Sequence, residues 1–249
     1  MRDPRESGAG FWRSLLKGDV NSAITFMKGN ASAQQIAFIR SQMKQYRRPE
    51  LLSTPLNVLE TVVFDLETTG FSYQHGDEII SIGAVCTRGM TVMEKESFHL
   101  IVNSGAAVSE QITALTGITQ SMVDGAVSLT DGLHDFMAFV EGKVLVAYAA
   151  GHDRGFLNAA LWKTSRVRLT HRLLDTLMLA RHLYPELSDY SLDKLLQSQG
   201  IPVDGRHDAL SDALMTARLW TVYLEEIQRR RYAETLGDLY VYLSRGSSY

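Results

Sequence analysis

The chain has 249 residues and a formal net charge of -3, with 45% hydrophobic and 21% charged residues. These values are ordinary for a globular protein and argue against a disordered chain or a general nucleic-acid coat. No apolar run approaches the roughly 20 residues that span a bilayer, and residues 1–10 lack the apolar core of a secretory signal. The single cysteine, Cys86, excludes an intrachain disulfide and a thiolate metal cluster, so a cytoplasmic protein is expected.

Residues 1–57 are expected to form a helical extension that ends in a linker. Apolar residues recur at helical spacing over 11–16 and 36–46, and the proline-bounded stretch 49–55 indicates the linker. The second helix carries a basic flank of Arg40, Lys44, Arg47 and Arg48. One interpretation is an accessory arm that binds nucleic acid or a partner such as a polymerase or repair protein. The preferred interpretation is an arm packed on the main domain, because charge runs usually face water.

The main domain is predicted to begin near residue 58 with three strands. A β-branched and aromatic run over 61–64 indicates a buried strand, and further strands are expected over 78–86 and 94–102, with Gly89 in the turn between them. Strands joined by such short connections pair in antiparallel fashion.

Two helices and a fourth strand follow. The pattern predicts a short helix over 112–119, capped by Gly117, and a longer amphipathic helix over 129–140. The next strand, over 144–147, comes after a helical crossover, which favours parallel pairing. The remainder of the chain is predicted to be mostly helical.

Two carboxylates follow the first strand. Asp65 and Glu67 are two residues apart and therefore point to the same face of an extended chain, with apolar Leu66 on the other face. Two anions held this close repel each other unless a cation lies between them, and carboxylate oxygens suit Mg²⁺ and Mn²⁺. Residues 68–70 then turn the chain and offer backbone N–H groups. The alternative is a strand that ends in an acidic surface turn.

A second acidic position follows the 144–147 strand. A helix is expected to start near Asp153 and to pack Phe156 and Leu157 on the sheet, with Asp153 on the same inward face. The alternative is an aspartate favoured only by the helix dipole. Asp175 is assigned a structural role as the cap of the helix that ends before Pro185.

The third position joins a histidine to an aspartate. The spacing over 210–224 predicts a long amphipathic helix, with Asp212 in its first turns and His207 in the loop before it. An imidazole on a loop over a metal site can take a proton from water. The alternatives are a surface histidine and a solvated helix aspartate. The other histidines lack metal-ligand spacing and are interpreted as structural: His75, His99, His134, His152, His171 and His182.

With these positions together, the chain resembles the DEDDh 3′–5′ exonucleases, a family similar to the epsilon subunit of bacterial DNA polymerase III. The resemblance covers residues 58–230. It is carried by Phe-Asp-Leu-Glu-Thr-Thr-Gly over 64–70, by Asp153 with Phe156 and Leu157, by Tyr-Ser-Leu-Asp-Lys-Leu-Leu over 190–196, and by His207 and Asp212 in a His-x-Ala-x-x-Asp motif.

The resemblance implies an RNase H-like α/β fold, a mixed five-stranded sheet flanked by helices, over residues 58–230. Residues 1–57 would be an N-terminal helical extension and linker, and 231–249 a C-terminal tail. It further implies two divalent cations, Mg²⁺ or Mn²⁺, held by Asp65, Glu67, Asp153 and Asp212. His207 would be the general base, and the substrate would contact Leu66, Thr68, Thr69 and Phe156, the two threonines through their backbone.

The implied activity is metal-dependent hydrolysis at a single-stranded or frayed 3′ end of nucleic acid, which releases nucleoside 5′-monophosphates. DNA is the expected substrate rather than RNA. Proofreading, repair and RNA trimming remain alternatives. A different alternative is a non-catalytic docking module that works through residues 1–57. The chain departs from the family at Tyr148 and Ala149, where His-Asn is usual, and at His152, where Phe is common. These changes concern substrate grip and rate rather than the metal-binding carboxylates.

Overall fold

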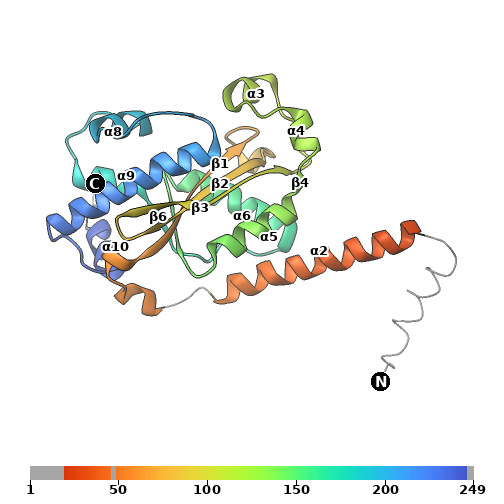
Figure 1. Cartoon of the computed structure of the whole chain (residues 1–249), viewed down its shortest axis with the longest axis horizontal. Coiled ribbons are helices and arrows are strands. Elements are labelled where there is room, and N and C mark those ends of the chain that lie inside the picture. The colour runs from red at the N-terminus through yellow and green to blue at the C-terminus, as the bar shows by residue number, and fades with distance from the viewer. Residues whose placement is uncertain (1–19, 46–48, 246–249) are drawn as a thin grey trace.

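The computed structural model describes residues 20–45 and 49–245, and its centre is a six-stranded mixed sheet with the order β4-β3-β2-β1-β5-β6. Helices cover both faces of this sheet (Figure 1). The strands are β1 (Glu60–Thr68), β2 (Ile79–Arg88), β3 (Thr91–Asn103), β4 (Val127–Ser128), β5 (Val144–Ala147) and β6 (Leu173–Asp175).

The pairing of the strands agrees with the sequence prediction. β1 pairs antiparallel with β2, and β2 pairs antiparallel with β3, whereas β5 pairs parallel with β1 and with β6. The mixed α/β fold is therefore confirmed. The sheet has six strands, where the resemblance implied five and the residue pattern located four. The two that the pattern did not locate are two-residue β4 and three-residue β6, which are too short to show an alternating pattern.

The helices and their caps follow from local sequence. Gly117 ends α3 in the left-handed region at φ 74°, and the Asp175 side chain accepts the Leu177 N–H to cap α7, both as predicted. Ser109 caps the start of α3. The helices are α2 (Val20–Gln45), α3 (Glu110–Thr116), α4 (Gln120–Asp124), α5 (Leu129–Val140), α6 (Gly151–Ser165), α7 (Thr176–Leu183), α8 (Leu192–Ser198), α9 (Ala209–Arg229) and α10 (Leu236–Ser244). Short 3-10 turns lie at η1 (Pro49–Ser53), η2 (Leu56–Val58) and η3 (Tyr73–His75).

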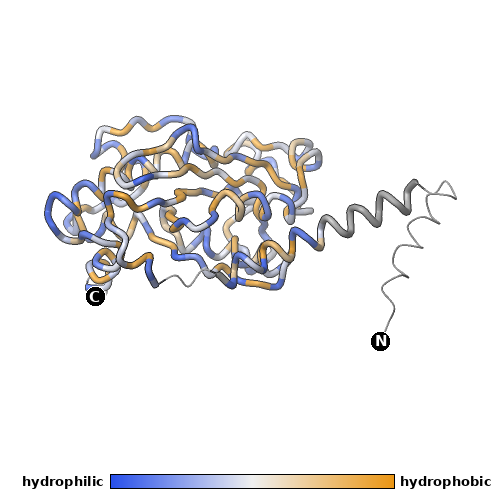
Figure 2. The backbone as a smooth tube through the Cα atoms, turned by 60° about the horizontal axis from the view of Figure 1, so that its bottom comes forward, coloured by the Kyte–Doolittle hydropathy of each residue, from blue (hydrophilic) through white to orange (hydrophobic). Residues whose placement is uncertain are grey.

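Two apolar cores lie on opposite faces of the sheet. Along β1, Val63 packs with α7, α8, α9 and α10, whereas Val62 and Phe64 pack with α2, α5 and α6. Trp220 and Tyr223 of α9 are fully buried in the first core. The hydrophobic parts of the backbone gather along the central strands (Figure 2). β1 is thus fixed from both sides, which gives the residues at its end a rigid base.

The second half of α2 is packed on the main domain. Ile39 is fully buried and Met43 is nearly so, in the core shared with α5 and α6. The Arg40 Nε donates to the Ser165 carbonyl at 2.9 Å, and the Thr170 hydroxyl donates to the Met43 carbonyl at 2.8 Å. These contacts agree with the preferred interpretation of a packed arm.

Only part of the predicted basic flank of the N-terminal arm lies among the residues that the structure describes. Arg40 and Lys44 are exposed on α2, as a solvated basic edge requires. The helix expected over 11–16 and the basic residues Arg47 and Arg48 lie outside the described residues.

Residues 231–249 contain α10, whose Leu236 and Leu239 are fully buried in the first core. The backbone just before α10 pairs with residues 54–56: the Leu56 N–H donates to Glu234 O at 2.8 Å, and the Leu236 N–H donates to Thr54 O at 3.0 Å. The division at residues 58 and 230 stays a prediction. Among the described residues, every helix is too short or too polar to cross a bilayer.

Replacing Ile39 by alanine tests the contribution of α2 to the fold. We expect Ile39→Ala to lower the free energy of unfolding by about 2–4 kcal/mol, because it leaves a cavity between α2, α5 and α6. Denaturant unfolding measures the change. The control is Ala37→Ser on the exposed side of α2, which should change stability by no more than about 0.5 kcal/mol. Equal stability of both variants would contradict packing of α2 on the domain.

Candidate active site

The end of β1 and the first turns of α6 and α9 surround one open cavity of about 430 Å³. All four predicted carboxylates and the predicted histidine line it: Asp65, Glu67, Asp153, Asp212 and His207. Glu67, Asp153 and Asp212 are each less than a tenth exposed, and Asp65 is partly buried. Acidic side chains from three distant segments therefore meet at one edge of the sheet.

A glycine in β2 lets α9 reach this edge. Gly83 lies opposite Asp65 in the β1–β2 ladder, and a Cβ at Gly83 would stand 2.1 Å from the carbonyl carbon of Ala209. The first turn of α9 consequently rests directly on the strand backbone, which brings Asp212 beside β1. The sequence analysis did not single out Gly83. A glycine inside an apolar strand is the signal that would have found it, since it often marks close backbone approach.

Asp153 is joined to β1 by a backbone hydrogen bond. The N–H of Leu66 donates to the Asp153 carboxylate, so α6 is tied to the strand between Asp65 and Glu67. β5 delivers α6 to this position because it lies parallel to β1 and ends at the same edge of the sheet. The predicted inward orientation of Asp153 is therefore observed.

Burial raises the pKa of three of these carboxyl groups, and neighbouring negative charges add to the rise at Asp65 and Glu67. Burial raises the pKa of Glu67 to about 7, and the negative charge of Asp212 adds to the rise. Burial also raises the pKa of Asp153 to about 7, and it raises the pKa of Asp65 well above its usual range together with the charges of Asp153, Asp212 and Glu67. Such a cluster favours protons or metal cations over free ionisation.

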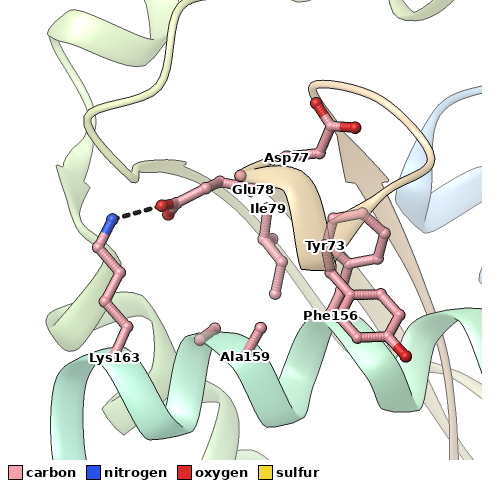
Figure 3. A pocket seen from close by; sticks show the side chains of 9 residues that line it. Tyr73, Asp77, Glu78, Ile79, Phe156, Ala159 and Lys163 are labelled. Atoms are coloured by element: carbon pink, nitrogen blue, oxygen red, sulfur yellow. Dashed lines mark hydrogen bonds and ion pairs between the residues drawn. The ribbon is translucent and has the colours of Figure 1, made fainter.

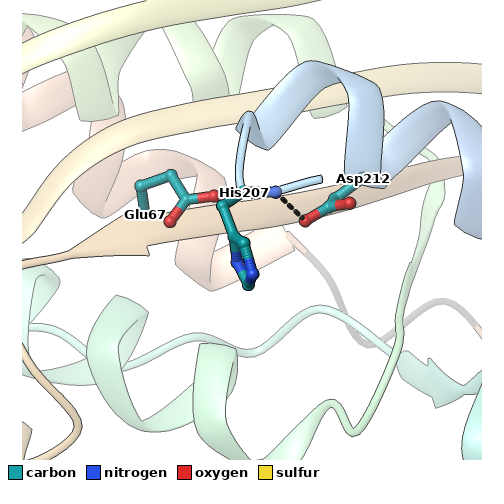
Figure 4. A group of neighbouring side chains, drawn as sticks. All are labelled: Glu67, His207 and Asp212. Carbon is teal, nitrogen blue, oxygen red and sulfur yellow. Dashed lines mark hydrogen bonds between the residues drawn. The ribbon is translucent and has the colours of Figure 1, made fainter. Parts of the chain in front are cut away.

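The donor atoms fit hard divalent cations. Potential ligand atoms of Glu67, His207 and Asp212 all lie within 4.8 Å of one another (Figure 4). The other two carboxylates add oxygen donors on the same cavity wall. Carboxylate oxygens suit Mg²⁺ and Mn²⁺.

His207 is held by its backbone as well as by its place in the chain. Its N–H donates to Asp212 Oδ2 at 3.1 Å, and its φ of 65° lies in the left-handed region (Figure 4). Asp208, the next residue, caps α9 by accepting the Ser211 N–H at 2.9 Å. These two bonds fix the loop over the cavity and keep the imidazole next to Glu67 and Asp212.

Arg206 is a second residue that the sequence analysis did not single out. Its guanidinium forms an ion pair with Asp212 Oδ1, and its Nε donates to Asp193 Oδ1 at 2.7 Å. Arg206 also lines the cavity and lowers the pKa of the neighbouring carboxylates Asp65 and Glu67 against the larger effect of their burial. A basic residue immediately before His207 was the available signal.

The four residues predicted to contact substrate do not all lie on the cavity wall. Leu66 and Thr68 line the cavity, whereas the Thr69 N–H is occupied by a hydrogen bond to Glu78 O at 2.9 Å. Phe156 is only 1% exposed, and its ring lies 4.8 Å from the ring of His152. Phe156 thus lies in the core behind His152, and its contact with substrate stays a prediction.

The loop that follows β1 is fixed on α6 beside the main cavity. Tyr73 packs on Gly155, where a Cβ would stand 2.3 Å from the tyrosine ring, and Lys163 Nζ lies 2.6 Å from Glu78 Oε1 (Figure 3). These contacts surround a smaller cavity of about 200 Å³. The loop carries Phe71, which lines the main cavity and is 81% exposed. Phe71 is an apolar surface at the entrance that the sequence analysis missed.

Tyr148 and Ala149, which replace the His-Asn pair usual in the family, both adopt a defined local structure. The Tyr148 hydroxyl donates to the carbonyl of Tyr190, in the segment before α8, and Ala149 adopts a positive φ of 51°. Both residues line the cavity. Tyr148 thus joins the end of β5 to the opposite wall instead of leaving a free polar group in the cavity.

A model of the exonuclease family matches residues 62–220 of the chain. The DNA polymerase III PolC-type proteins of Caldanaerobacter subterraneus subsp. tengcongensis and Clostridium perfringens are both 40% identical, over 171 and 160 residues, or 68% and 64% of the chain. The chain spans only 12% and 11% of the length of these two relatives.

Solved structures share the fold. The nuclease domain of 3′hExo, a DEDDh family member bound to rAMP, matches 68% of this chain and 93% of its own, with a TM-score of 0.60 and 23% identity. Exonuclease X in complex with 5′ overhanging duplex DNA matches 73% of this chain and 98% of its own, with a TM-score of 0.56 and 22% identity.

The raised pKa of Glu67 predicts how stability varies with pH in a chelating buffer. The folded state keeps a proton that the unfolded state loses near pH 4.5, so this contribution to stability is present below pH 4.5 and is lost as the pH rises to about 7. We expect Glu67→Gln to exceed the wild type in stability by about 2 kcal/mol at pH 8, and to match it near pH 4.

Thermal unfolding of both proteins across this pH range measures the difference. Glu96→Gln, at an exposed position of β3, serves as the control and should follow the wild type at every pH. A wild type that gains stability relative to Glu67→Gln between pH 4 and pH 8 would contradict the assigned pKa.

Proposed function

The chain belongs to the exonuclease family, and on this premise we propose that it is a 3′–5′ exonuclease of the DEDDh type. It hydrolyses terminal phosphodiester bonds of nucleic acid and releases nucleoside 5′-monophosphates. The observation that carries the proposal is the meeting of Asp65, Glu67, Asp153 and Asp212 with His207 around one open cavity. A volume in the range of small-ligand sites suits a single terminal nucleotide better than a duplex.

The four carboxylates are the residues that would hold two divalent cations, Mg²⁺ or Mn²⁺. When bound, such ions would offset the negative charge of the phosphate and lower the pKa of a water, so that the water can give up a proton and act as the nucleophile. His207 is the general base: its ring stands among potential ligand atoms of Glu67 and Asp212, and its backbone bond to Asp212 keeps it there. Leu66, Thr68 and Phe71 on the cavity wall bind and orient the terminal nucleotide.

DNA is the proposed substrate, with a single-stranded or frayed 3′ end. The relatives of the chain are DNA polymerase III proteins of the PolC type, which supports a proofreading or repair setting in the cytoplasm. Residues 1–57 would then bind a polymerase or repair protein. A docking module without activity is the poorer alternative, because buried carboxylates that repel one another destabilise a protein that has no use for a cation.

Digestion of a 5′-labelled single-stranded DNA oligonucleotide tests the activity and its polarity. With Mn²⁺, we expect a ladder of products that shortens from the 3′ end, and we expect Asp65→Asn to lower the rate by about a thousandfold or more. The matched control is Asp135→Asn, at an exposed position of α5, which should keep the wild-type rate. Full-length substrate with folded wild-type protein, or immediate release of the 5′ label as a mononucleotide without intermediate lengths, would contradict the proposal.

Replacing His207 tests the general base separately from the metal site. We expect His207→Gln to lower kcat by about 10²–10⁴-fold, because a positioned base contributes a factor of that size. Retained Mn²⁺ binding by calorimetry would show that the loss is chemical. A rate that stays within threefold of the wild type, with the same dependence on pH, would exclude His207 as the base.

A further inference from the structure

Arg206 links two acidic side chains on different helices. Its guanidinium pairs with Asp212 at the start of α9, and its Nε donates to Asp193 in α8 at 2.7 Å. The Asp212 side chain is 6% exposed, whereas the Asp193 side chain is 50% exposed. Arg206 therefore spans from the interior of the carboxylate cluster to its solvent-facing rim.

The two oxygens of Asp212 face different groups, and Oδ1 is buried and accepts no hydrogen bond, although it forms an ion pair. Oδ2 accepts the His207 N–H at 3.1 Å, and Oδ1 faces the Arg206 guanidinium. A carboxylate oxygen can accept a backbone N–H and bind a metal at the same time, because it has two lone pairs. It cannot hold a guanidinium and a divalent cation at bonding distance without strong repulsion between the two cations.

We infer that Arg206 is a built-in competitor for the divalent cation at Asp212 and thereby sets the metal affinity of the site. The inference rests on the proposed function, since it assumes that Asp212 is a metal-binding residue. Arg206 balances the charge of Asp212 until a cation replaces it, and the pairing with Asp193 then keeps the displaced side chain at the rim. Arg206 is accordingly a positioning residue.

The competition has a measurable consequence. Removing a group that must be displaced increases the affinity for the displacing ion, because the free energy of the lost ion pair no longer opposes binding. We expect Arg206→Ala to bind Mn²⁺ about fivefold to tenfold more tightly than the wild type, a coupling typical of a partly buried pair. Isothermal calorimetry with manganese chloride and the full chain measures it.

Two control variants test whether an effect of the Arg206 variants comes from competition with the cation. One examines the loss of a positive charge, and the other examines the loss of the contact between the loop and α8. Arg218→Ala removes the same charge from α9, where Arg218 pairs with Glu94 at an exposed position, and should change the Mn²⁺ affinity by less than about twofold. Asp193→Asn weakens the tether between the loop and α8 but leaves Arg206 beside Asp212, and it should not tighten Mn²⁺ binding.

Stability gives a second, independent measurement. In a chelating buffer, Arg206→Ala should melt at a lower temperature than the wild type because Asp212 loses its counter-charge, and saturating Mn²⁺ should remove that difference. If Arg206→Ala does not fold, Arg206→Gln removes the charge and retains a hydrogen-bond donor toward Asp193. The same tighter Mn²⁺ binding is expected of it.

The outcomes are distinguishable. Equal or weaker Mn²⁺ binding by the Arg206 variants, or equal tightening by Asp193→Asn, overturns the role of Arg206 and leaves the proposed function standing. A folded wild type that binds no Mn²⁺, with no response to the ion in the melting temperature, overturns the proposed function itself.

Discussion

Repulsion among buried carboxylates is the constraint on which the site depends. Burial raises the pKa of Asp65, Glu67 and Asp153, and the charges of neighbouring carboxylates add to the rise, so the ionised forms of these groups are disfavoured in the folded chain. The fold tolerates this arrangement because its cores lie on both sides of β1 and do not depend on the charged edge. Stability is thus supplied by the apolar layers, and the sheet edge is left for chemistry.

The scaffold holds the acids through backbone contacts that side-chain changes alone cannot easily move. The Leu66 N–H fixes Asp153 to β1, the His207 N–H fixes the loop to Asp212, and Gly83 admits the backbone of α9 to the strand. The three contacts involve β1, the loop before α9, and β2, and each brings a different element to the acidic edge of the sheet. Together they place groups from distant parts of the sequence without a long flexible connection.

Much of this could be predicted from the sequence. The apolar run over 61–64, the helix over 129–140 and the parallel strand at 144–147 carry strong local patterns, and all three were found at those positions. The positions of the carboxylates followed from the two-residue spacing of a strand and the periodicity of the helices. These are properties of single elements, which neighbouring residues determine.

What the sequence did not yield depends on contacts between elements. The pairing of Arg206 with Asp212 and Asp193 requires knowing that α8 and α9 start side by side, and the burial of Phe156 beneath His152 requires the depth of α6 in the core. The backbone pairing of residues 54–56 with 234–236 has a wider consequence. Because it ties the segment before β1 to the start of α10, and α10 is buried in the same core, these two parts of the chain should unfold together rather than one after the other.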